Sequence, residues 1–213
     1  WGQALALVAA GAAARGADLA DRAVAFLLEA VEVSERGRHP VTATLARVAL
    51  GYCYLDLDRL DDAESCVLGV AVTLGGLDLQ PHASLGARVL HAQVLRRRGE
   101  PDRALAELDA ALADSANEPG LLFPRRQALA HRAGTLLELG RTDEALAAAQ
   151  EAVVAPAEDV RSEVVALRVL GTALRAAGDP DGGRKALEQA LEAARSTGQT
   201  AEVAPTEALL AAG

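Results

Sequence analysis

A short alanine-centred phrase recurs along the chain at a nearly constant interval, and this periodicity limits the folds that the chain can adopt. Two clear copies read "PDRALAELDAAL" and "TDEALAAAQEAV". The small residue near the start of each copy is Ala23, Ala63, Ala104, Ala145 and Ala186. Successive copies lie 40, 41, 41 and 41 residues apart. Such a period is typical of a solenoid, in which each unit packs only against its neighbours.

A second small residue precedes each phrase and indicates that two helices form each unit. These residues are Gly51, Ala92, Ala133 and Gly171, and the leucines three positions later are Leu95, Leu136 and Leu174. Residues at i and i+3 share one face of a helix, so we expect a close seam between antiparallel helices. Only 2% of the residues are aromatic, which also favours a thin core filled by small side chains.

The turn between the paired helices has its own signals. Gly99, Gly140 and Gly178 are predicted to end helices in the left-handed conformation, with Asp58 taking that place in the second unit. Thr142 is predicted to cap the helix that follows it. The residues that suit a first helical turn are Pro101, Pro180, Asp102, Asp143 and Glu144.

These patterns predict an all-α fold, a right-handed α-solenoid of about five helix-turn-helix repeats. The expected helix pairs are 2–14 with 18–36, 41–57 with 59–75, 82–98 with 101–115, 124–139 with 142–155, and 160–177 with 181–197. The repeats span about 1–38, 41–76, 82–118, 121–157 and 159–198, followed by a capping segment at 200–213 with a helix at 203–212. We expect residues 1–213 to form one domain of a longer protein, without a sheet.

The repeats resemble those of the tetratricopeptide repeat family. "LGYCY" at 50–54 fits the family's Leu-Gly-x-x-Tyr, "LGTAL" at 170–174 is a looser match, and the family's alanine matches Ala63, Ala104, Ala145 and Ala186. The chain departs from the pattern in its period, since the family usually repeats every ~34 residues, and in its weak Trp and Pro marks. The longer repeats and the chain's ending are similar to those of MalT-like and LuxR-type bacterial transcription activators.

The resemblance implies a non-catalytic binding scaffold whose first helices line a concave groove. By repeat register, the groove residues are Tyr52, Gln93, Arg96, Gln127, Arg168, Thr172 and Arg175. A strip of arginines suits a carboxylate or an acidic peptide, and a small effector is the alternative ligand. For the arginines, a solvated helical face is the competing interpretation, and Arg96, Arg97 and Arg98 also suit the negative end of a helix.

Two roles follow from the resemblance: the sensor or interaction region of a bacterial transcriptional regulator, or an adaptor that assembles a complex, either alone or beside an enzymatic domain. We expect no enzyme activity and no cofactor, because the sequence has no GxxxxGK[ST], GxGxxG, GxSxG or HExxH. The four histidines have no metal-ligand spacing, so no metal is expected.

The charge and the apolar runs limit the partners further. A net charge of −9 argues against direct nucleic-acid binding by this region. Cys53 and Cys66 are predicted to be reduced core thiols of a cytoplasmic protein, with a redox pair as the alternative. The apolar run at 4–14 is too short to span a membrane. The apolar first helix is expected to meet a preceding repeat, or a second copy through self-association. The preference for Arg over Lys is typical of a GC-rich genome.

Overall fold

A computed structural model describes residues 1–74, 81–115, 122–155 and 160–212, and these residues form eleven helices and no strand. The predicted all-α repeat fold is therefore confirmed. The predicted links at "GGLDLQP", "SANEPG" and "VAPAED" lie wholly or largely outside the described residues.

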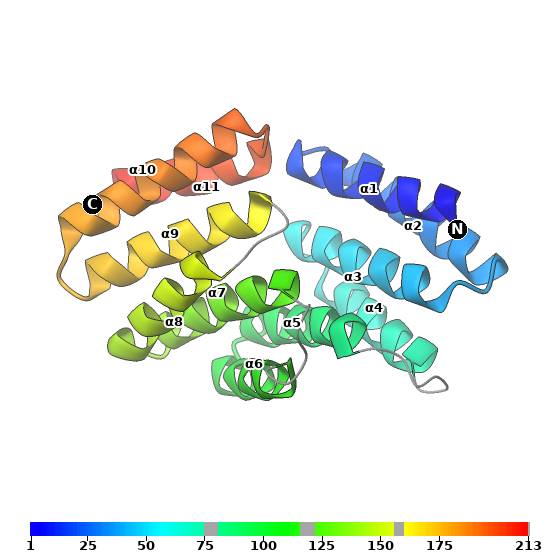
Figure 1. Cartoon of the computed structure of the whole chain (residues 1–213), viewed down its shortest axis with the longest axis horizontal. Coiled ribbons are helices and arrows are strands. Elements are labelled where there is room, and N and C mark those ends of the chain that lie inside the picture. The colour runs from blue at the N-terminus through cyan, green and yellow to red at the C-terminus, as the bar shows by residue number, and fades with distance from the viewer. Residues whose placement is uncertain (75–80, 116–121, 156–159, 213) are drawn as a thin grey trace. The chain divides into compact units, whose positions relative to one another are not determined.

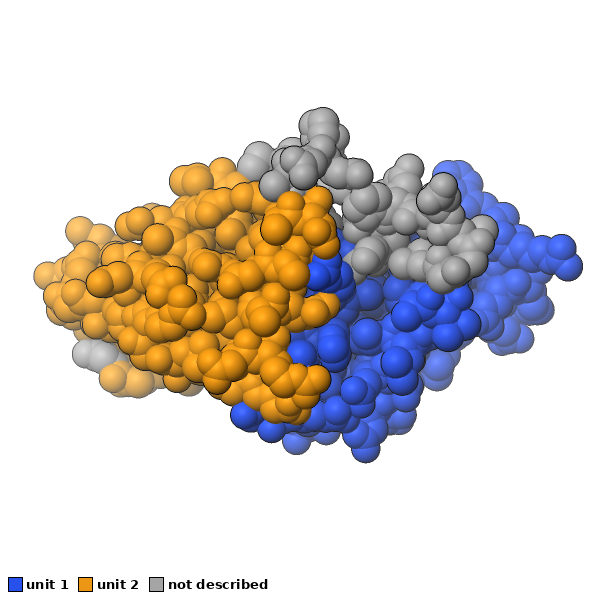
Figure 2. Space-filling model, turned by 90° about the horizontal axis from the view of Figure 1, so that it is seen from below, with its two compact units in different colours: residues 1–99 blue, residues 100–213 orange. Residues whose placement is uncertain are grey.

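The chain divides into two compact units, residues 1–99 and 100–213, coloured separately in Figure 2. The first unit contains α1 (Gly2–Gly16), α2 (Ala20–Arg36), α3 (Pro40–Asp56), α4 (Leu60–Leu74) and α5 (Pro81–Arg97). The second contains α6 (Pro101–Ser115), α7 (Leu122–Glu138), α8 (Thr142–Val154), α9 (Val160–Ala176), α10 (Pro180–Ser196) and α11 (Thr200–Ala211). The bounds agree with the predicted helices to within three residues.

Within each unit, consecutive helices pack as antiparallel pairs, and the first helices of successive pairs lie beside one another (Figure 1). In the first unit α3 contacts both α1 and α5, and in the second α9 contacts both α7 and α11. Each pair therefore buries its faces against its neighbours, as stacked repeats do.

The small residues at the two repeating positions are buried, as the sequence predicts. Ala23, Ala63, Ala104 and Ala145 are fully buried, and Ala186 is 5% exposed. At Gly171 on α9, an added Cβ would lie 2.6 Å from Leu187 Cγ and 2.8 Å from the carbonyl oxygen of Gly183, both on α10. The backbones of α9 and α10 can approach this closely only because both positions lack a side chain.

The predicted left-handed turn residues are confirmed. Gly99, Gly140 and Gly178 have φ values of 78°, 72° and 87°, and Asp58 has 57°. Pro101 and Pro180 begin α6 and α10, as expected.

The predicted cap at Thr142 is wrong. Thr142 is the first residue of α8, and the preceding Arg141 occupies the cap position without a side-chain hydrogen bond to the helix. Arg141 instead pairs with Glu144 at 2.7 Å. A side-chain cap exists at α10, where Asp179 accepts a hydrogen bond of 2.8 Å from the Gly182 amide. The sequence indicates where these turns lie, but the choice between neighbouring polar residues depends on side-chain geometry.

Candidate binding surfaces on the first helices

Tyr52, a predicted groove residue on α3, is buried with 7% of its surface exposed. The Arg15 guanidinium of α1 lies 5.0 Å from its ring centroid, within the range of a cation–π contact. Arg15 also binds Asp56 through two hydrogen bonds, Nε to Oδ2 at 2.6 Å and Nη2 to Oδ1 at 3.1 Å. Burial lowers the pKa of Arg15, but the hydrogen bond and charge of Asp56 raise it above its ordinary value. Tyr52 is therefore held in a charged contact between α1 and α3.

Gln93, the equivalent residue of α5, is also buried, with 8% of its surface exposed. Its Nε2 atom has no hydrogen-bond partner among the described residues. Gln93 lies four residues before Arg97, whose Nη2 reaches the Leu55 carbonyl of α3 at 3.5 Å. A buried amide without an acceptor costs about 1–3 kcal/mol. Because the Nε2 atom is itself buried, an external acceptor could reach it only after the Gln93 side chain changes its rotamer.

The basic run at the end of α5 consists of Arg96, Arg97 and Arg98. Two of these arginines form ion pairs with acidic residues of the preceding repeat. Arg97 pairs with Asp58 at 3.2 Å, and Arg98 pairs with Asp61 at 2.7 Å and Glu64 at 2.8 Å. Arg96 is half-buried. The sequence did not predict these pairs, which join residues from two successive repeats.

In the second unit, the predicted residue Gln127 is half-buried on α7. The residue before it, Arg126, has a structural role. Arg126 is 7% exposed, and its guanidinium donates to the carbonyl of Ala155 at 2.8 Å and to that of Val153 at 3.1 Å. These carbonyls lie at the end of α8, where unpaired acceptors need donors. Sequence reasoning missed this role, since nothing in the local pattern separates Arg126 from Arg125.

The other three predicted residues, Arg168, Thr172 and Arg175, lie on α9 at a spacing that places them on one face. That face contacts α11. Arg168 Nη1 donates to Glu202 Oε2 at 2.6 Å, and Arg175 Nη1 donates to the Leu209 carbonyl at 2.5 Å. Thr172 is half-buried, and its hydroxyl donates to the Arg168 carbonyl at 3.0 Å. The helix that the sequence predicted as a cap thus occupies part of the predicted arginine strip.

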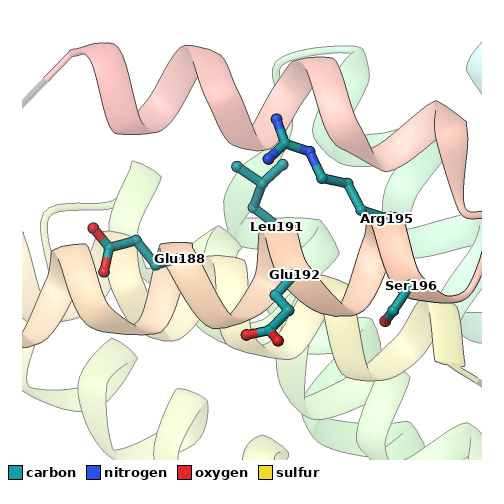
Figure 3. Close-up of a pocket in the computed structure, with 5 residues that line it drawn as sticks. All are labelled: Glu188, Leu191, Glu192, Arg195 and Ser196. Carbon is teal, nitrogen blue, oxygen red and sulfur yellow. The ribbon is translucent and has the colours of Figure 1, made fainter.

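A surface pocket of about 390 Å³ lies along α10, lined by Glu188, Leu191, Glu192, Arg195 and Ser196 (Figure 3). Leu191 and Arg195 point toward α11, while Glu192 points away from it (Figure 3). Arg195 forms an ion pair with Glu207 of α11. All five lining residues come from one helix, so this is a shallow surface without the converging groups of an enclosed ligand site.

The described residues contain no cluster of three or more His, Cys, Asp or Glu able to hold a metal ion. Cys53 and Cys66 are both buried and form no disulfide, in agreement with the expected core position. Across the described ranges, no helix combines the length and the apolar character needed to cross a bilayer.

Solved structures with this fold include several repeat proteins. NprR in complex with its cognate peptide NprX has a TM-score of 0.75 and 13% identity, over 89% of this chain and 55% of that chain. The thermophilic tetratricopeptide protein TTC0263 from Thermus thermophilus has a TM-score of 0.66 and 17% identity, over 98% and 97% of the two chains. BtubC from P. vanneervenii has a TM-score of 0.64 and 21% identity, over 91% and 82%.

These likenesses place the chain among all-helical, tetratricopeptide-like repeat folds. The chain spans just over half of the NprR chain that it resembles. No protein-family model matches its sequence, and no curated protein sequence matches it. The fold is thus established by structure rather than by sequence identity.

Proposed function

We propose that this chain is a non-catalytic scaffold that binds a peptide or protein segment on the inner faces of its first helices. The observation that supports this most is its likeness to NprR, which was solved with a bound peptide and which aligns over 89% of this chain. Fold likeness alone does not determine function, so the residues of the surface must supply the chemistry.

The first unit offers suitable chemistry for a peptide. Gln93 has a buried amide donor without a partner among the described residues, and a peptide backbone carbonyl would satisfy it once a change of side-chain rotamer exposes the amide. Arg96 lies three residues further along α5 and is half-buried. A guanidinium at that position favours a carboxylate, because its charged, forked donors match the two oxygens. These features favour an acidic peptide over an apolar one. A small carboxylate effector is the alternative ligand.

Such a scaffold would serve as the sensor or interaction region of a bacterial transcriptional regulator. The resemblance of the long repeats to those of MalT-like and LuxR-type activators supports this role. The alternative is an adaptor that assembles a complex or accompanies an enzymatic domain. Sequence flanking the chain discriminates between them, since an ATPase module on one side and a helix-turn-helix on the other would favour the regulator.

The test is selection of a random phage-displayed peptide library on the purified chain, followed by titration of the enriched peptides. We expect acidic peptides whose Kd rises at least tenfold for Gln93→Ala and for Arg96→Ala. The matched control is Arg36→Ala on α2, whose side chain is 69% exposed and pairs at 3.7 Å with Glu32, one turn earlier on the same helix. Peptides that bind Gln93→Ala, Arg96→Ala and Arg36→Ala equally well would contradict the proposal. The test leaves Arg168 and Arg175 unchanged because both contact α11.

A further inference from the structure

The helix α11 docks on its unit through buried polar side chains and an apolar contact, in which Val203 packs against the cluster of Val164, Ala190 and Ala194. Its two buried residues are Glu202, with 3% of its surface exposed, and Thr206, which is fully buried. Its larger apolar residues, Val203, Leu209 and Leu210, are only half-buried. The other helices of the unit bury alanine and leucine at their contacts. Apolar burial normally drives helix docking, and here the buried positions of α11 are polar, so the polar contacts of Glu202 contribute to holding it in place beside Val203.

The carboxylate of Glu202 lies between two arginines of α9. Arg161 Nη2 is 2.7 Å from Glu202 Oε1, and Arg168 Nη1 is 2.6 Å from Glu202 Oε2. Each carboxylate oxygen thus meets one guanidinium, in a site where the glutamate side chain is 5% exposed. Removing one partner of a buried ion pair leaves the other charge uncompensated and is strongly destabilising. Arg175 of α9 donates a further hydrogen bond to the Leu209 carbonyl of α11. We call Arg161, Arg168 and Arg175 the α9 arginine cluster.

The sequence of α11 is a poor helix former by itself. The helix has twelve residues, which is short for a helix in water. Pro205 lies inside it and has no backbone N–H to donate to the preceding turn. Only α9 and α10 contact it extensively among the described elements. Its folded state therefore depends on its docking to α9 and α10.

We propose that α11 is a detachable, autoinhibitory segment, and that the α9 arginine cluster binds an acidic helical segment of another protein when α11 leaves. The proposal rests on the proposed scaffold function and names a second, regulated part of its binding surface. The incoming segment would place a carboxylate where Glu202 lies and would compete with α11 for the same guanidinium groups. Charge complementarity selects this occupant, since Arg161 and Arg168 together hold one carboxylate, that of Glu202.

Competition between α11 and an external segment for the α9 arginine cluster predicts how substitutions in α11 change the affinity for that segment. The tethered α11 is present at a high effective concentration, so an external segment binds the intact chain weakly. Loss of the Glu202 charge weakens the tethered helix without removing any arginine. The affinity for an external segment then rises, because a larger fraction of the chain has its cluster vacant.

The experiment uses the full chain and a fluorescein-labelled peptide with the sequence of residues 199–212, "QTAEVAPTEALLAA". Fluorescence anisotropy should give a Kd at least tenfold lower for Glu202→Gln than for the wild type. Glu207→Gln is the matched control, because Glu207 lies on the same helix but pairs with Arg195 of α10 and has 48% of its side chain exposed. It should bind the peptide as the wild type does. A peptide that itself carries Glu202→Gln should lose binding to every variant.

Hydrogen exchange on the wild type provides a second, independent test. We expect the amides of α11 to exchange at least tenfold faster than those of α10, since a detachable helix opens without unfolding its unit. Exchange of α11 together with α10 would show that it is an integral element and would overturn the proposal. So would fast exchange combined with no peptide binding to a folded Glu202→Gln chain. If Glu202→Gln fails to fold, the exchange comparison decides. None of these results affects peptide binding at Gln93 and Arg96, so the two proposals can fail separately.

Discussion

Cys66 of α4 shows how the environment of a single residue sets its chemistry. Its Cβ lies close to Gly51 of α3, and 7% of its surface is exposed. Burial raises the pKa of its thiol to about 11, and the charge of Arg47 only partly opposes this. The thiolate is the reactive form, so a thiol with this pKa is a poor nucleophile at neutral pH. This environment favours the interpretation of a core thiol over that of a redox pair.

The raised pKa of Cys66 predicts a pH dependence of stability. The unfolded thiol ionises near its ordinary pKa of 9.0, whereas the folded one stays protonated until about 11. The unfolded state therefore loses its proton first, and the free energy of unfolding should fall between about pH 9 and pH 11. Urea titrations from about pH 8 to about pH 11 would measure this fall.

Cys66→Ala is the comparison that isolates the effect. Tyr54 also has a raised pKa, chiefly from burial and next from the charge of Cys66, so its contribution falls in the same direction in both proteins and is smaller in the variant. The variant should therefore lose less stability than the wild type over this range. Parallel curves for the two proteins would show that Cys66 does not titrate differently on folding.

Single residues also mark the limit of sequence reasoning. The turns were predicted correctly because Gly99, Gly140 and Gly178 recur with the repeat and have the expected positive φ. The cap at Thr142 was predicted wrongly. Thr142 lies one position inside the helix, and from there its hydroxyl cannot reach the amides that a true cap satisfies. Arg126 was missed since its acceptors, at Val153 and Ala155, lie on a different helix.

At the scale of the element, the glycines of the first helices have two different roles. At Gly171 a Cβ would meet Leu187 and the backbone of Gly183 at less than 3 Å. At Gly86 on α5 the nearest atom to a Cβ would be Val48 Cγ1, at 3.5 Å, an ordinary contact. The first glycine is required by helix packing, whereas the second only makes its helix less rigid.

Alanine at these two positions should therefore have opposite effects. Gly171→Ala is expected to destabilise the protein by about 1–3 kcal/mol, because α9 and α10 must separate. Gly86→Ala should stabilise it by about 0.5–1 kcal/mol through helix propensity. Denaturant unfolding of both variants measures the difference. Stabilisation by both substitutions would mean that the α9–α10 contact relaxes at little cost.

The helices themselves were predictable because each repeats a local pattern of small and apolar residues. The polar contacts between the helices could not be predicted in this way. Arg168 and Arg175 were predicted as groove residues from register, but their contacts with Glu202 and Leu209 join positions 34 residues apart. No local pattern indicates such a pair, and only the folded packing of α9 against α11 brings the groups together. The predicted binding role of these arginines therefore stays a prediction.

At the scale of the whole molecule, charge limits the partners. The chain has 21 Lys and Arg against 30 Asp and Glu. Several arginines are also engaged by acids, as Arg15 is by Asp56, Arg98 by Glu64 and Arg168 by Glu202. Local positive charge is thus largely neutralised where it occurs. Phosphate-backbone binding needs an uncompensated basic surface, because its free energy comes from counterion release.

We therefore expect this chain to bind no duplex DNA at physiological salt. Proteins that bind DNA nonspecifically do so with Kd values of about 10⁻⁴–10⁻⁶ M. A gel-shift titration of a short duplex with the chain at up to about 10⁻⁴ M should show no retarded band, where a basic control protein shifts the duplex fully. Such a result would agree with the proposal that the chain recognises a peptide or protein segment. A salt-sensitive shift would instead reveal a basic surface and contradict the predicted absence of nucleic-acid binding.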